Sequence, residues 1–106
     1  MTGSKFFSIL VSLLAFAALS AAATDSEIEA AVAQSDDYST HKSAFIAAAR
    51  SLVESQQCTP EELKDIGGFA KSPSYKSRPI YFTYCGGMMA IENRIMLDAS
   101  TGRIFR

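Results

Sequence analysis

The apolar residues of this chain are arranged in three patterns that follow one another along the sequence. The first is a predominantly apolar run over residues 6–19, with Lys5 before it and the small residues Ser20-Ala21-Ala22-Ala23 after it. A positive residue, an apolar run and an A-x-A-like stretch make up a secretory signal peptide. The run is shorter than the roughly 20 apolar residues of a transmembrane helix. We therefore expect residues 1–23 to be a signal peptide that meets the membrane only transiently and is cut after Ala23.

In the second pattern, apolar residues recur at helical spacing between residues 24 and 66. The capping-box sequence Thr24-Asp25-Ser26-Glu27 predicts the start of a short helix that runs to about residue 34. A longer helix is expected from about residue 39 to about residue 56, on the apolar line Phe45, Ala48, Ala49 and Leu52. Thr59-Pro60-Glu61-Glu62 carries the start signals of a third, two-turn helix, which a pair of glycines ends.

In the third pattern, apolar and polar residues alternate as they do in β-strands. Residues 80–85 and 94–98 predict two strands, and a tight turn at residues 99–102 leads to a short last strand over residues 103–106. Residues 70–79, with two prolines and three serines, are expected to form a loop. Helices first and strands last indicate one small α+β domain over residues 24–106, with N-terminal helices packed on an antiparallel sheet of about three strands.

Cys58 and Cys85 are the two cysteines of the sequence. An even cysteine count in a small exported chain predicts a disulfide, and two cysteines allow a single intramolecular pairing. The bond would join the start of the third helix to the end of the first strand. Closing a loop of this size stabilises the fold by about 3.5 kcal/mol in the loop-entropy model, a large share of the roughly 5–15 kcal/mol typical of a domain.

Charge is distributed unevenly along the chain. Residues 25–37 carry five acidic residues and no basic one, whereas residues 71–106 carry six basic residues and two acidic ones. We therefore predict a partner-binding loop for an anionic partner, such as an acidic protein, a glycan or a lipid head group, formed by Lys71, Tyr75, Lys76 and Arg78. The alternative is a solvated loop whose charges only aid solubility. Nucleic acid is not expected as a partner of an exported, mildly acidic chain.

Catalytic and metal-binding patterns are weak in this sequence. His41 is the single histidine, and Cys58 would lie about 25 Å further along a continuous helix, so a Cys–His nucleophile is not expected. Met88, Met89, Met96 and His41 are ligand types used for copper, but they lack chelating spacing, and we expect the methionines to fill gaps in the core. No catalytic residue, metal or cofactor is predicted.

The C-terminal part of the chain resembles the end of a PepSY domain. The resemblance rests on Pro79-Ile80-Tyr81-Phe82-Thr83-Tyr84 and on residues 94–105, where Asp98-Ala99-Ser100-Thr101-Gly102 ends a strand before a final short one. It spans residues 79–105, and the two cysteines and the Gly67-Gly68 break depart from the family pattern. The resemblance implies a non-catalytic extracytoplasmic domain, in some members inhibitory or regulatory toward peptidases, and it transfers no catalytic residue.

These patterns favour a small exported binding protein that is not an enzyme. The expected location is the bacterial periplasm or the outside of the cell, and the expected partner is an envelope protein or an anionic surface, with the protein acting as an inhibitor or accessory factor of a cell-envelope enzyme. One alternative is a periplasmic carrier of a metal or small ligand. A second alternative is a small envelope enzyme with a reactive cysteine.

Overall fold

The structure, a computed structural model, describes residues 22–106 of the chain. The signal peptide expected over residues 1–23 therefore lies almost wholly outside the described residues. Within the described part, no helix is long and apolar enough to cross a membrane.

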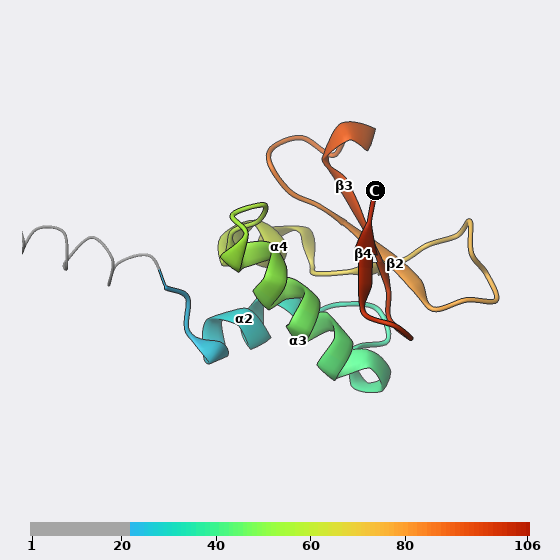
Figure 1. The fold of residues 1–106 in the computed structure, drawn as a ribbon, viewed down its shortest axis with the longest axis horizontal. Helices are drawn as coiled ribbons and strands as arrows, with labels where there is room; N and C mark the ends of the chain where they lie inside the picture. Colours follow the sequence, from blue (N-terminus) through green and yellow to red (C-terminus); the bar gives the residue numbers. More distant parts are fainter. Residues whose placement is uncertain (1–21) are drawn as a thin grey trace, which may run out of the picture.

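Within residues 22–106, three helices precede a four-stranded antiparallel sheet, so the predicted α+β class is confirmed. Figure 1 shows how the labelled helices and strands are arranged. The helices are α2 (Asp25–Val32), α3 (Tyr38–Glu54) and α4 (Pro60–Ile66). The strands are β1 (Ala70–Lys71), β2 (Ile80–Tyr84), β3 (Arg94–Asp98) and β4 (Arg103–Phe105), and a 3-10 turn, η1 (Ile91–Asn93), precedes β3. The strand order is β1-β2-β3-β4, a meander in which each strand pairs with the next.

The sheet has one strand more than predicted. This strand, β1, lies at the start of the segment that we expected to be a loop. It consists of two residues, Ala70 and Lys71, which pair with Phe82 and Tyr81 of β2. Two residues are too few to give an alternating pattern, so this strand had no signal in the sequence. The rest of the segment, from Ser72 onward, is a loop as predicted.

Matching capping boxes begin α2 and α4. The Thr24 hydroxyl accepts from the Glu27 amide at 3.2 Å, and the Glu27 carboxylate accepts from the Thr24 amide at 3.0 Å. Thr59 and Glu62 repeat both bonds at 3.1 and 3.0 Å. These bonds satisfy backbone donors that have no partner within a helix. In contrast, α3 begins at Tyr38 after an Asp37 that makes no side-chain cap bond, slightly before the expected start.

The core lies between the helices and one face of the sheet. Phe45 of α3 stacks on Phe69 with ring centroids 5.3 Å apart and meets Tyr81 of β2 edge-on at 5.0 Å. Tyr81 pairs with Leu97, and Leu97 with Ile104, so these inner-face side chains form one row across the sheet. The buried residues that complete this core include Ile28, Ala31, Val32, Ala49, Leu52, Leu63 and Ile95.

The segment between α2 and α3 is fixed against the start of the sheet. Ser35 is buried, and its hydroxyl accepts from the Phe69 amide at 2.8 Å, while Asp36 accepts from the Lys71 amide at 2.8 Å. Gly68 allows this contact, because a Cβ at that position would collide with the Ser35 hydroxyl and lie 3.2 Å from the Cα of Val32. A glycine that looked like a helix stop is therefore also a point of close backbone approach.

The disulfide between Cys58 and Cys85 is present, with the two Cα atoms 5.2 Å apart. It joins the residue before Thr59, the N-cap of α4, to the residue after β2. The prediction that the bond ties the helical half to the sheet is confirmed.

Candidate binding surfaces

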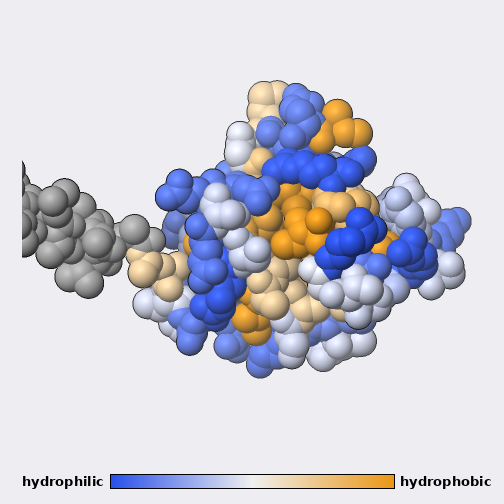
Figure 2. Space-filling view, in the orientation of Figure 1, coloured by the Kyte–Doolittle hydropathy of each residue, from blue (hydrophilic) through white to orange (hydrophobic). Residues whose placement is uncertain are grey.

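Two loops project from the domain in different directions (Figure 1). The first contains the predicted binding residues and is here named the basic loop, residues 71–79. The second follows Cys85 and is here named the apolar loop, residues 86–93. In Figure 2 the region of the basic loop is blue and white, whereas orange and tan surface lies at the tip formed by the apolar loop.

Lys71 holds the basic loop together from within. Its Nζ donates to the backbone oxygens of Tyr75 at 2.8 Å, Arg78 at 2.9 Å and Ser72 at 3.4 Å. An ammonium has three donors, and here they meet three carbonyls of a loop that has little other regular structure. Lys71 therefore has a structural role that the charge pattern alone did not reveal.

Arg78 is also engaged inside the molecule. Its Nη2 lies 3.2 Å from Oδ2 of Asp98, whose side chain is 6% exposed. The other carboxylate oxygen of Asp98 accepts from the hydroxyl and the amide of Ser100 at 2.6 and 3.0 Å. The Ser100 hydroxyl first, and then its amide and Arg78, hold the pKa of Asp98 below its ordinary value.

The four residues predicted for partner binding therefore lie together in one loop but differ in what they contact. Lys71 and Arg78 bond to the loop and to the sheet, whereas Lys76 is exposed and forms no ion pair among the described residues. Tyr75 is 36% exposed and lies beneath the Arg78 guanidinium at 5.7 Å. The binding role of this loop stays a prediction.

The apolar loop carries the most exposed large apolar side chains of the described chain. Met88 is 78% exposed, Met89 73% and Ile91 72%. The expectation that methionines fill the core is thus wrong for Met88 and Met89, although Met96, at 7% exposed, is buried. Residues 88–90 extend no strand, because they follow two glycines with positive φ and have no paired neighbour.

Hydrogen bonds give the apolar loop a defined shape without a core of its own. The Cys85 amide donates to the Asn93 carbonyl at 3.1 Å and closes the loop beside the disulfide. The Asn93 side-chain amide donates to the Met88 carbonyl at 2.9 Å, and the Ala90 amide reaches the same carbonyl at 2.8 Å. The apolar side chains therefore stand on a backbone that is tied at its base and across its middle.

Glu62 anchors the loop to α4. One carboxylate oxygen accepts from the Gly86 amide at 2.8 Å, and the other accepts from the Thr59 amide at 3.0 Å. The bond from Gly86 is the main cause that lowers the pKa of Glu62. The local sequence predicts the bond of this glutamate to the helix cap, but its second partner, Gly86, lies 24 positions further along the chain and has no local signal.

The possible metal ligands are not brought to one place. His41 packs its ring against Tyr81 at 5.4 Å and Phe45 at 6.0 Å, on the inner side of the sheet. Met96 pairs with Phe82 and so points to the opposite face from Tyr81. Residues 22–106 hold no cluster of three or more His, Cys, Asp or Glu residues suited to a metal. Both cysteine sulfurs are bonded to each other, and no free cysteine remains.

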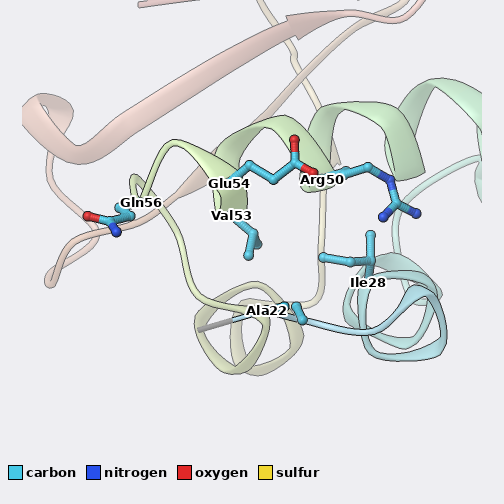
Figure 3. Close-up of a pocket in the computed structure, with 7 residues that line it drawn as sticks. Ala22, Ile28, Arg50, Val53, Glu54 and Gln56 are labelled. Carbon is cyan, nitrogen blue, oxygen red and sulfur yellow. The ribbon is translucent and has the colours of Figure 1, made fainter. Parts of the chain in front are cut away.

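A hollow of about 340 Å³ lies between α2 and α3 and is shown in Figure 3. Ile28 and Val53 point into it, and Gln56 also belongs to its lining. Ala22 and Ala23 form part of its lining. The cleavage expected after Ala23 would remove both alanines, so we do not assign this hollow as a binding site.

Comparison with protein-family models, with curated proteins and with solved structures gave no match to this chain. The resemblance of residues 79–105 to the end of a PepSY domain thus rests on the quoted residues and on the order of helices and strands.

Proposed function

We propose that this protein is an exported, non-enzymatic binding protein that contacts an envelope enzyme through the apolar loop and acts as its inhibitor or accessory factor. The observation that carries the proposal is the exposure of Met88, Met89 and Ile91 on a loop that hydrogen bonds hold in shape. Export is supported by the three-part sequence pattern of residues 1–23 and by the disulfide, which is typical of oxidising compartments.

The exposed side chains suit an interface because they are apolar, close together and already positioned. Clustered exposed apolar residues mark interaction sites on soluble proteins, and methionine adapts its shape to a partner surface. A loop that needs no reordering also loses little conformational entropy when it binds. The apolar loop therefore has the properties of a protruding element that enters an apolar cleft.

Charges near the loop favour a protein over an anionic surface. Glu62 and Asp65 lie beside Met89 around a hollow at the base of the loop, and Glu92 lies within the loop and is exposed. Three carboxylates at this position, against the one Arg106 guanidinium that donates to the Glu92 carbonyl, would disfavour anionic lipid head groups. A cleft of an envelope protein with an apolar floor is the partner that fits.

The test compares three versions of the mature protein, residues 24–106, as bait for an envelope extract. In the first variant, Met88, Met89 and Ile91 are all changed to Ser, which removes the apolar contact without touching the bonds of the backbone. In the second, Tyr75→Ser and Lys76→Ser change the basic loop while leaving Lys71 and Arg78 in place. Captured proteins are quantified, and the purified candidate is then assayed with added bait.

We expect wild type and the Tyr75/Lys76 variant to capture the same enzyme and to change its activity, and the apolar-loop variant to bind it at least about 100-fold more weakly. Equal capture by wild type and the apolar-loop variant would contradict the proposal. Loss of capture in the Tyr75/Lys76 variant alone would instead assign the contact to the basic loop. Binding of wild type to anionic vesicles in place of a protein would also refute it.

A further inference from the structure

The outer face of the sheet, away from the helices, is hollowed next to the basic loop. Phe82, Met96 and Phe105 form one row across β2, β3 and β4, and Tyr84 pairs with Arg94 in the adjacent row. With residues 72–75 of the basic loop and Arg106, these side chains line a hollow of about 290 Å³. Its position differs from that of the apolar loop, so it does not depend on the function proposed above.

The lining is aromatic and cationic. Four of the lining side chains are aromatic, namely Tyr75, Phe82, Tyr84 and Phe105, and none is a carboxylate. Arg103 lies over the Phe105 ring at 4.2 Å and adds a further positive charge nearby. Asp98, which also lies on this face, is buried and already paired with Arg78. The side chains that line the hollow therefore offer positive charge and include no carboxylate.

Arg94 and Arg106 differ in what they contact. Arg106 donates to the carbonyl of Glu92 at 3.3 Å and to the side chain of Gln57 at 2.9 Å. Arg94 is half-buried and takes part in none of the three ion pairs of the described chain. A guanidinium without a carboxylate partner beside aromatic rings is suited to bind a carboxylate of a ligand through two parallel hydrogen bonds.

The volume of the hollow limits the size of the ligand that it can hold. Sites for drug-sized molecules begin at about 300 Å³, so this hollow admits a molecule of roughly amino-acid size. We propose that it binds a small free carboxylic acid with an aromatic or branched apolar body. Arg94 holds the carboxylate, and the rings of Phe82 and Phe105 contact the apolar part.

The test is an NMR titration of the disulfide-bonded mature protein with 3-phenylpropionate. Saturable shifts are expected at Phe82, Met96 and Phe105, with a dissociation constant on the order of 1 mM for so small a ligand. The neutral amide of the same acid isolates the contribution of the charge, and it should bind at least about tenfold more weakly.

Two variants matched in charge locate the anion. Arg94→Gln should weaken binding at least about tenfold, whereas Arg50→Gln, which changes an arginine of α3 paired with Asp25, should leave it unchanged. The spectrum away from the hollow reports whether each variant is folded.

Three outcomes would overturn the proposal. The first is the absence of saturable shifts with the acid. The second is equal binding of acid and amide, or of wild type and Arg94→Gln, because the charge would then not matter. The third is binding of a peptide ending in a free phenylalanine carboxylate without binding of the free acid, which would assign the hollow to a chain terminus.

Discussion

The basic loop and the apolar loop make opposite use of their side chains. In the basic loop, Lys71 donates hydrogen bonds to backbone carbonyls and Arg78 forms an ion pair with Asp98. Two of its three charged side chains therefore stabilise the fold. In the apolar loop, backbone and Asn93 bonds set the shape, and the apolar side chains remain in solvent. A charged loop is thus not automatically free to bind, and an apolar segment is not automatically core. Whether a loop is available for binding depends on which of its polar and apolar groups already have partners within the protein.

The largest effect is expected from the disulfide, which closes the base of the apolar loop. Changing Cys58 and Cys85 to Ser should lower the free energy of unfolding by about 3.5 kcal/mol, measured by urea denaturation against the oxidised wild type. Hydrogen exchange should also accelerate more at residues 86–93 than at residues 71–79. Equal acceleration in both loops would contradict the idea that the disulfide stabilises the apolar loop, whereas the bonds of Lys71 and Arg78 stabilise the basic loop.

A smaller effect is expected from Lys71. Changing it tests whether this lysine stabilises the basic loop through its bonds to the loop carbonyls. Lys71→Ala removes bonds from a charged donor to three carbonyls and should cost about 1–2 kcal/mol of unfolding free energy. The matched variant Lys76→Ala changes an exposed lysine of the same loop and should stay within about 0.5 kcal/mol of wild type. If both variants were equally stable, Lys71 would be as free to bind a partner as Lys76.

The smallest effect concerns how the stability depends on pH through Asp98. Its pKa is lowered in the folded state, so the ionised carboxylate stabilises the fold above its unfolded-state pKa of about 3.9. That contribution is lost as the pH falls through the lower, folded-state value. Asp98→Asn should therefore be less stable than wild type near pH 7, and the difference should shrink below about pH 4.

The check is urea denaturation of both proteins across this pH range, with Glu54→Gln as the control, because Glu54 is exposed on α3. A difference between wild type and Asp98→Asn that does not change with pH would mean that the charge of Asp98 does not hold the basic loop to the sheet.

The elements of this fold were predictable where the signal is local. Apolar spacing, the two capping boxes and the alternation of β2 and β3 each depend on residues within a few positions of one another. The pairing of Cys58 with Cys85 was predictable for a different reason, because two cysteines allow a single intramolecular disulfide. The strand β1 was not, since its two residues depend entirely on pairing with β2.

The candidate binding surfaces were less predictable because they depend on distant partners. The charge of Lys71 was visible in the sequence, but its three carbonyl partners were not. The exposure of Met88 and Met89 has one local signal, a continuous apolar stretch between two glycines and Glu92, which gives neither a helical nor a strand face. The row of Phe82, Met96 and Phe105 required the register of three strands, which sequence alone left open.

Glu62 and the disulfide fasten the same two segments by different chemistry. The disulfide joins residues 58 and 85, and the Glu62 carboxylate joins the amides of the next residues, Thr59 and Gly86. A reductant breaks the first fastening and leaves the second, whereas acid that protonates Glu62 does the reverse. Under either condition alone, the junction between helices and sheet therefore keeps one of these two contacts, although each loss weakens it.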